Sequence, residues 1–351
     1  ELCGRSFSKS TVSALCAALD PVVIAFRDRQ LEKRYPFVMA DALYTKVREN
    51  GRIRCKGFMI AVGINEQGFR EILGFSCADS ETEAGWTTFF RELKGRGLAQ
   101  VDMVISDSHK GLVQAVKQWF QGATWQRCQT HFSRNLLDKT PKSVQPELKE
   151  DIRKVYEAVD MDSARAAKNH ILNKYESKAP KAMELLDEGF DDITAVLSLP
   201  LRYRKRLRTS NGIERLNQEI RRRERVIRIF PNEASAIRLI GALLIEQDEK
   251  WSTGRKYFEM DVYYNSLIQE EKTENQVAAV NPVQQYFQDQ GALRKIKSIL
   301  GEKAKSFVTT VLQLTATNSQ LANANPETVY AAAVTAATLD LPVNPNFGFA
   351  Y

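Results

Sequence analysis

The segment between residues 36 and 128 constrains the fold most, because strand-like and helix-like patterns follow one another there in a defined order. A turn at residues 65–68 joins the second and third predicted strands as a hairpin. A capping-box pattern of Ser80 with Glu83 opens a helix after the third strand. A second helix, which carries Leu112, Ala115, Val116 and Trp119, follows the fourth strand directly after Asp107. The order β-β-β-α-β-α-β predicts an α/β fold, a mixed sheet flanked by helices. The predicted strands are PFVMAD (36–41), GFMIAVGIN (57–65), REILGFS (70–76), VDMVIS (101–106) and TWQRC (124–128).

Two aspartates occupy similar places in this pattern, each at the end of a predicted strand. Asp41 ends the strand FVMA, and Asp107 ends the strand VDMVIS. Adjacent strands of one sheet would place the two carboxylates side by side, which is unfavourable unless a cation lies between them. Mg²⁺ prefers such oxygen ligands and keeps several waters, so two or three carboxylates suffice to hold it. The alternative is that Asp107 caps the next helix and Asp41 caps a turn.

A third acid, Glu214, lies in the segment TSNGIERLNQEIRRRERVIRIF, residues 209–230. We expect a helix here with Ser210 as N-cap, because its hydroxyl can accept a hydrogen bond from a free amide of the first turn. At 3.6 residues per turn, Glu214 shares a face with Asn217 and Arg221, beside an apolar face of Ile213, Leu216 and Ile220. A carboxylate followed by arginines suits a metal held against a phosphate backbone. The alternative is a solvated basic helix whose Glu214 complements the positive helix N-terminus.

Positive charge is concentrated around this predicted helix. The chain has a formal net charge of +7, and the segment from Arg202 to Arg228 contains 11 Lys or Arg against three acids. Such clustering attracts phosphate backbones through counterion release without reading the base sequence; a solubilising surface is the alternative. The candidate DNA-binding residues are Arg202, Arg204, Lys205, Arg206, Arg208, Arg221, Arg222, Arg223, Arg225 and Arg228.

The remainder of the chain has helical periodicity and the composition of a cytoplasmic protein. A first helix is expected to end at Pro21, a long helical stretch runs from His131 to about Pro200, and another helix covers residues 234–251. Five cysteines, odd in number and far apart, fit a reducing cytoplasm. No apolar run approaches the length of a membrane span and no secretory pattern opens the chain, so we expect no membrane partner.

Four motifs, in order, carry a resemblance to a known family. The chain closely resembles the IS256 (Mutator-like) family of DDE transposases over about residues 1–265. The motifs that carry this resemblance are MADALYTKVRENGRIR, VISDSHKGL, CQTH and TSNGIERLNQEIRRR. The resemblance implies an RNase H-like core in which Asp41, Asp107 and Glu214 form the catalytic and metal-binding triad, with Mg²⁺ or Mn²⁺ as cofactor. It also implies that Cys128 and His131 are supporting residues near the site. A zinc site there lacks a second Cys or His pair.

The resemblance also implies a division of the chain into domains. Its first parts are a remnant of a helical DNA-binding region (1–34) and the first part of the RNase H-like core (35–131). An all-helical insertion (132–205) precedes the last part of the core, which carries the catalytic helix (206–265). After a polar linker (266–282), the helical C-terminal tail (283–351) is similar to the N-terminal part of RecT-type phage single-strand annealing proteins, with helices expected near 283–315 and 325–338.

The function implied by the resemblance is Mg²⁺-dependent DNA cleavage and strand transfer in the transposition of an insertion sequence. Its partners would be double-stranded DNA, as terminal inverted repeats and as target, and a second copy of the chain, because joining two element ends requires two active sites. The expected location is the bacterial cytoplasm, on the nucleoid when DNA is bound. Two alternatives are a catalytically inactive DNA-binding remnant fused to an annealing-protein fragment, and an RNase H-like nuclease without transposition.

Overall fold

The computed structural model of the chain describes residues 8–269, 282–301, 304–318, 321 and 324–338. The chain forms two compact units that divide between Tyr263 and Tyr264. Most of the predicted linker (266–282) and the end of the predicted tail, beyond residue 338, lie outside the described residues. Each unit is therefore considered by itself.

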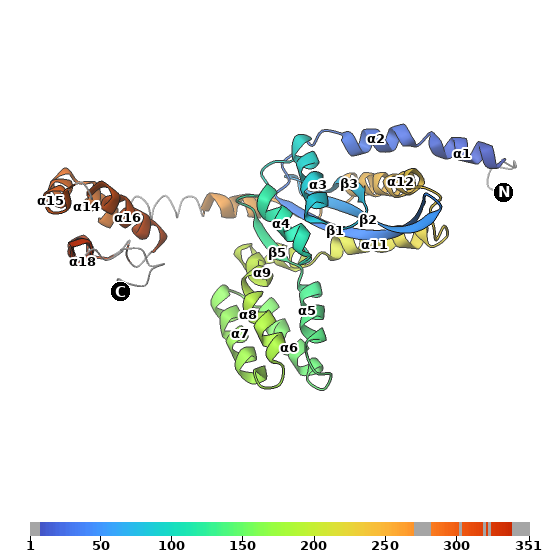
Figure 1. The fold of residues 1–351 in the computed structure, drawn as a ribbon. Coiled ribbons are helices and arrows are strands. Elements are labelled where there is room, and N and C mark those ends of the chain that lie inside the picture. Colours follow the sequence, from blue (N-terminus) through green and yellow to red (C-terminus); the bar gives the residue numbers. More distant parts are fainter. Residues whose placement is uncertain (1–7, 270–281, 302–303, 319–320, 322–323, 339–351) are drawn as a thin grey trace. The chain divides into compact units, whose positions relative to one another are not determined.

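The first unit is built on a five-stranded mixed sheet with the order β3-β2-β1-β4-β5 (Figure 1). Strands β1, β2 and β3 pair antiparallel, and β4 and β5 continue the sheet parallel to β1. This arrangement confirms the predicted α/β class with a mixed sheet, and it is consistent with an RNase H-like fold. The strands are Phe37–Glu49 (β1), Arg52–Ile64 (β2), Arg70–Ala78 (β3), Met103–Ser106 (β4) and Thr124–Arg127 (β5).

Strands β1 and β2 are longer than predicted, because they continue as a hairpin to a two-residue turn. Asn50 and Gly51 form this turn with φ angles of +50° and +77°. A hairpin turn of this length favours positive φ at both central residues, and Asn-Gly is the pair that adopts it most readily. The prediction that Asp41 ends its strand is therefore wrong, since β1 continues to Glu49 in register with β2.

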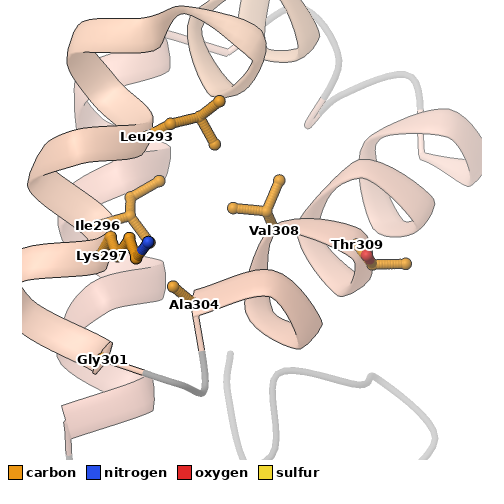
Figure 2. A pocket seen from close by; sticks show the side chains of 7 residues that line it. All are labelled: Leu293, Ile296, Lys297, Gly301, Ala304, Val308 and Thr309. Carbon is orange, nitrogen blue, oxygen red and sulfur yellow. The ribbon is translucent and has the colours of Figure 1, made fainter.

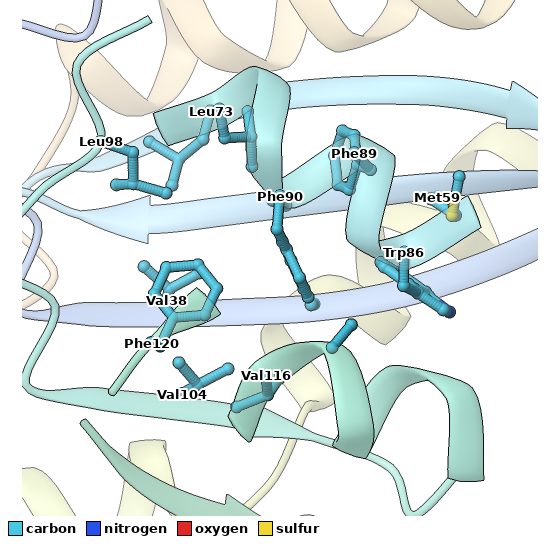
Figure 3. Packing of buried hydrophobic residues seen from close by; sticks show 14 of the residues in the cluster. Val38, Met59, Leu73, Trp86, Phe89, Phe90, Leu98, Val104, Val116 and Phe120 are labelled. Carbon is cyan, nitrogen blue, oxygen red and sulfur yellow. The ribbon is translucent and has the colours of Figure 1, made fainter. Parts of the chain in front are cut away.

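One face of the sheet is covered by helices α3 (Glu83–Gly95) and α4 (Lys110–Trp119), with a hydrophobic core between them and the strands (Figure 3). The Phe90 ring lies 5.0 Å from the Phe120 ring, centroid to centroid. Helix α3 begins after Thr82, whose hydroxyl accepts a hydrogen bond from the Gly85 amide at 3.1 Å. The predicted capping box at Ser80 is therefore wrong, because the helix begins two residues later than it required.

The opposite face of the sheet is covered by helices α11 (Asn211–Glu224) and α12 (Glu233–Ser252). Close packing of α12 requires Gly241, since a Cβ there would lie 2.5 Å from Val23 and 3.0 Å from Phe75 of β3. Tyr203, Phe258 and Tyr263 pack with Phe37 of β1 as an aromatic cluster. A further helix covers residues 261–269.

Two helices precede the sheet, α1 (Lys9–Ala17) and α2 (Asp20–Asp28). Pro21 lies in the first turn of α2, where its missing amide costs nothing, so it opens a second helix, where it was expected only to end the first. Asp20 anchors α2 to α12 through Arg238 at 2.6 and 2.7 Å. By length and composition alone, residues 9–28 are long and apolar enough to cross a membrane. The core helix of a soluble protein and a signal sequence meet the same criterion. The expectation that no apolar run reaches this length is corrected for that stretch.

Residues 129–207 are helical and have a hydrophobic core of their own. Gln126 of β5 joins this region to the sheet: its side-chain amide donates to the Ile193 carbonyl at 3.0 Å and its carbonyl accepts from the Val196 amide at 2.6 Å. The elements are α5 (Gln129–Asp138), α6 (Gln145–Tyr156), α7 (Met161–Tyr175), α8 (Pro180–Glu188), α9 (Phe190–Thr194), η1 (Ala195–Ser198) and α10 (Leu201–Leu207).

The second unit contains the helices that were expected in the tail. Their shared core includes Phe287, Ile296 and Phe307. An open, mainly apolar cavity of about 390 Å³ lies between α15 and α16, with Leu293 and Val308 on its two sides (Figure 2). The helices are α14 (Pro282–Gln288), α15 (Gln290–Leu300), α16 (Ala304–Thr317) and α18 (Pro326–Thr338).

Candidate active site

Asp41 and Asp107 lie where strands β1 and β4 diverge. The parallel pairing ends with Met39 opposite Ile105, and each aspartate comes two residues after that pair. Asp107 directly follows Ser106, the last residue of β4, as predicted. Asp41 remains inside β1, but on a part of the strand that β4 no longer accompanies. The two side chains are close enough for the charge of Asp107 to affect the ionisation of Asp41.

Helix α11 brings Glu214 to the same end of the sheet. The side-chain amide of Asn217 donates a hydrogen bond to Oδ2 of Asp41 at 2.9 Å. Glu214 lies three residues earlier, about one helical turn away on the same side of α11. The helix is held in place by a buried face that consists of Ile213, Leu216, Asn217 and Ile220.

The Asp41 carboxyl is half-buried in an acidic environment. Burial raises the pKa of Asp41 to about 7, and the negative charges of Asp107 and Glu214 contribute to this rise. A hydrogen bond from the Ala42 amide and the nearby His131 oppose this shift. A cation near these carboxylates would remove the repulsion that disfavours ionised Asp41. The oxygen donors of this acid triad therefore fit Mg²⁺ or Mn²⁺.

Cys128 and Ser210 form the wall of the site next to Glu214. The Cys128 amide donates to the Ser106 carbonyl at 2.8 Å, which fixes the end of β5 beside the end of β4. The Ser210 hydroxyl lies 3.2 Å from the Cys128 sulfur and 2.8 Å from Glu214 Oε1. Ser210 precedes α11, but its hydroxyl caps no amide. The prediction of Ser210 as the N-cap residue is therefore confirmed in position, but its predicted side-chain hydrogen bond is wrong, because the buried hydroxyl donates to the Glu214 carboxylate instead.

His131, on α5, lies beside both Cys128 and Glu214. Its Nδ1 atom is buried without a hydrogen-bond partner and lies 3.8 Å from Glu214 Oε1. The adjacent Cys128 sulfur, followed by Glu214 and Asp41, raises the pKa of His131 to about 9 against the effect of burial. Burial alone would raise the pKa of the Cys128 thiol, but its contacts with His131 and Ser210 outweigh this effect and lower the pKa. In the part of the chain that the structure describes, the ligand atoms of Cys128, His131 and Glu214 lie within 4.8 Å of one another, whereas those of the acid triad are more widely spaced.

The five candidate arginines between residues 221 and 228 divide into two groups. Arg222 and Arg223 form ion pairs with Glu219 at 2.6 and 3.2 Å, on a solvent-exposed part of α11. The other three line a cavity beside β1: Arg221, Arg225 and Arg228. The first group is therefore partly neutralised within the helix, whereas the second is gathered around open space.

The basic residues before α11 also divide. Arg204 donates to the Leu199 carbonyl at 2.6 Å, Arg206 donates to the Tyr257 carbonyl, and Arg208 lies at 3.4 Å from a carbonyl of α6. Arg202 and Lys205 are exposed. Three of the residues that were predicted to bind phosphate therefore contact backbone carbonyls of the chain itself.

Three residues of this region were not identified from the sequence. Tyr44, Thr45 and Lys46 of β1 line the same cavity as the second group of arginines, and the Thr45 hydroxyl donates to Glu224 of α11. The available signal was Asn50-Gly51, because a hairpin turn at that position implies that β1 continues past Asp41.

Comparison with known proteins identifies similar chains. A family model described as "Transposase, Mutator family" matches residues 1–254. The chain is 46% identical over 265 residues to the transposase for insertion sequence element IS256 in transposon Tn4001 of Staphylococcus aureus, a match that covers 74% of this chain and 68% of the relative. It is 43% identical over 256 residues to the transposase for IS1081 of Mycobacterium tuberculosis, covering 73% and 62%. It is 40% identical over 261 residues to the transposase for ISRM5 of Rhizobium meliloti, covering 74% and 66%. The chain thus spans about two thirds of the length of these relatives.

Proposed function

The chain belongs to the Mutator family of transposases, and on this basis we propose that it cleaves DNA at the ends of an insertion sequence and joins them to target DNA, with Mg²⁺ or Mn²⁺ as cofactor. The observation that carries the proposal is the hydrogen bond from Asn217 to Asp41. It ties the helix that bears Glu214 to the strand that bears the first aspartate.

The three acids have a common role in this proposal. Asp41, Asp107 and Glu214 would hold the cations through carboxylate oxygens. When bound, two such ions roughly 3.5–4 Å apart activate an oxygen nucleophile and stabilise the leaving oxygen of an in-line phosphoryl displacement. Asn217 keeps the Asp41 carboxylate oriented. In the metal-free site, the raised pKa of His131, about 9, keeps a positive charge beside Glu214 at neutral pH.

The surface next to the site supplies cations for double-stranded DNA. Arg221, Arg225 and Arg228, together with the exposed Arg202 and Lys205, are placed to neutralise phosphates at the element ends and on the target. Because two ends are joined in one event, the active assembly is a homodimer on DNA. The location that suits these partners is the bacterial cytoplasm.

The proposal includes the domain division that the resemblance implies. Residues 132–205 act as an all-helical insertion before the catalytic helix, which is supported by the separate core of that region. Residues 1–34 are a remnant of a DNA-binding region. Residues 283–351 are a RecT-like segment joined to the transposase; the family match ends at residue 254 and a separate compact unit begins at Tyr264, which supports this division.

The test uses the full chain, a supercoiled plasmid that carries the element ends, and Mg²⁺. Wild-type protein is expected to nick the ends and join them to a target, whereas Asp107→Asn keeps the size of the side chain and loses the activity. Asp162→Asn is the control, since its side chain is 95% exposed and lies in the helical region. Full activity of Asp107→Asn would refute the triad.

The two alternatives give different results in the same assay. An inactive remnant binds the ends in a salt-dependent manner but shows no metal-dependent nicking. A nuclease without transposition nicks the plasmid but produces no joined product. Either pattern in the wild-type chain would replace the proposal.

A further inference from the structure

A cavity of about 500 Å³ lies beside the candidate active site, between β1 and the C-terminal half of α11. We call it the edge pocket, and the residues used here are Tyr44, Lys46, Arg221, Glu224, Arg225 and Arg228. Its volume is in the range of pockets that hold one small molecule. It is therefore large enough to take a single nucleotide.

The charge of the edge pocket selects an anion. Four of its lining side chains are cationic and one is acidic, and the acid, Glu224, accepts a hydrogen bond from the Thr45 hydroxyl. The arginines at 221, 225 and 228 follow helical spacing, so they project from one side of α11 and the turn after it. Arg222 and Arg223 project elsewhere and pair with Glu219. The arrangement concentrates positive charge in the pocket rather than along the whole helix.

The backbone holds Arg228 in an unusual conformation. Its φ angle is +62°, a left-handed value that residues other than glycine, asparagine and aspartate rarely adopt. The next turn is fixed to β1, because the Phe230 amide donates to the Lys46 carbonyl at 2.9 Å and the Arg48 amide donates to the Phe230 carbonyl at 2.8 Å. Arg228 is thus positioned at the pocket by a strand-like bridge.

The edge of β1 adds backbone donors. Pairing with β4 ends at Met39, and the bridge to Phe230 is at Val47. Between these points no strand pairs with this edge of β1 among the residues that the structure describes. The Lys46 carbonyl faces Phe230. By strand alternation, the amide of Tyr44 faces the same edge and is available to a phosphate oxygen.

We propose that the edge pocket holds one nucleotide of the DNA strand, unpaired from the duplex, a few positions from the bond that is cleaved. Its phosphate lies among the three arginines, and its base rests against Tyr44, the aromatic residue of the lining, since aromatic rings accept unstacked bases of any sequence. Tyr44 is three residues from Asp41, about 10 Å along the strand. At about 3.4 Å of rise per nucleotide, this places the unpaired position roughly three nucleotides from the scissile phosphate. The inference rests on the proposed function and adds a defined substrate contact to it.

The test measures DNA binding by the full chain in EDTA, so that it does not depend on cleavage. Element-end duplexes carry a single mismatch at each of the six positions on either side of the cleavage site. A mismatch removes part of the cost of unpairing, so wild-type protein is expected to bind about 5–10-fold more tightly when the mismatch is near the third position. Tyr44→Leu is expected to lose this gain, whereas Tyr44→Phe keeps it.

Charge variants test the phosphate contact separately. Arg225→Gln is expected to weaken binding about 10-fold and to lower the salt dependence by about one phosphate contact. Arg222→Gln removes the same charge from the same helix outside the pocket. Its expected loss of DNA affinity is several-fold smaller than that of Arg225→Gln. Lys250→Gln, on the exposed surface of α12, is expected to bind as wild type. Thermal unfolding of each variant establishes that it is folded.

Two results would overturn the inference. One is a flat mismatch profile, and the other is an equal loss for Arg222→Gln and Arg225→Gln. If the wild-type chain still cleaves and joins element ends in Mg²⁺, either result refutes only the proposed role of the edge pocket and leaves the proposed function intact. Absence of both DNA binding and cleavage in the wild-type chain would remove both.

Discussion

Asn217 and Asp41 are 176 residues apart in the chain, yet the Asn217 side-chain amide donates a hydrogen bond of 2.9 Å to Oδ2 of Asp41. Asn217 is buried and Asp41 is half-buried, so water competes with this contact less than it would at an exposed position. It sets the orientation of the first carboxylate from the helix that carries the third. The contact gives Asn217 a positioning role that a solvated face of α11 would not have.

Replacing Asn217 with leucine keeps the volume of the side chain but removes this donor. We expect cleavage of element ends to fall about 10–100-fold, the range found when a partner of a metal ligand is lost, together with a higher Mg²⁺ concentration at half-maximal rate. The measurement is a Mg²⁺ titration of nicking. Gln218→Leu, at an exposed neighbouring position, is the control. Equal losses in the two variants would mean that the contact has no positioning role.

The raised pKa of Asp41 predicts how metal and pH act on stability. The folded pKa is about 7 and the ordinary value is 3.8, so the metal-free folded state binds a proton more readily than the unfolded chain. The stability from this group is complete below pH 4 and is lost as the pH rises through 7. Mg²⁺ at saturating concentration is therefore expected to raise Tm by roughly 5–10 °C at pH 8 and by much less at pH 5.5. The measurement is thermal unfolding with and without Mg²⁺.

Asp41→Asn separates this effect from other groups. His131 also has a raised pKa, so its contribution falls with pH in the same direction. The variant cannot ionise at position 41, and we expect a smaller loss of stability between pH 5.5 and 8 and a weak response to Mg²⁺. If the stability of the Asp41→Asn variant depended on pH and on Mg²⁺ as strongly as that of the wild type, Asp41 would not be the group responsible, and the pH dependence would be assigned to His131.

The places of Asp107 and Glu214 could be predicted from the sequence because each follows from a local pattern, whereas the place of Asp41 inside its strand could not. Asp107 ends a short apolar strand, and Glu214 begins a helix whose apolar spacing is clear. The extent of β1 was not predicted, because the apolar run ends near Asp41 and the alternation beyond it is interrupted by polar residues. The turn at Asn50-Gly51 was the missing signal.

The contacts within the site could not be predicted in the same way. From the sequence, the Ser210 hydroxyl could either cap an amide or bind other side chains. The positions of Cys128 and Glu214 decide between these two roles. The same holds for the arginines. Nothing in the local sequence distinguishes Arg222 from Arg225, and only the position of α11 along β1 places Arg225 in the edge pocket. Long-range packing, and not local propensity, determines these outcomes.

The hairpin turn gives a prediction about stability. Gly51 has a φ angle of +77°, and a Cβ added there would meet no atom within 4 Å, so only backbone strain opposes a substitution. Gly51→Ala is expected to lower the free energy of unfolding by about 1–2 kcal/mol. Gly95→Ala is the matched control, since that position also has open space but no positive φ, and we expect no loss there. Denaturant unfolding compares the two; equal effects would exclude backbone strain at the turn.

Cys128 provides the last prediction, because its sulfur accepts a hydrogen bond from the Ser210 amide at 3.3 Å and lies 3.2 Å from the Ser210 hydroxyl. Cys128→Ala leaves the buried Ser210 amide without this partner, and we expect unfolding to become easier by about 1–3 kcal/mol. The Ser210 hydroxyl keeps Glu214 as a partner at 2.8 Å, so the loss falls on the amide. Cys128→Ser retains an acceptor and is expected to recover part of the loss, whereas Cys16→Ala, at an exposed position of α1, is expected to change stability by less than about 0.5 kcal/mol. Denaturant unfolding of the three variants is the measurement. Equal stability of the Cys128→Ala and Cys16→Ala variants would show that the sulfur is not the element that holds the start of α11 at the end of the sheet.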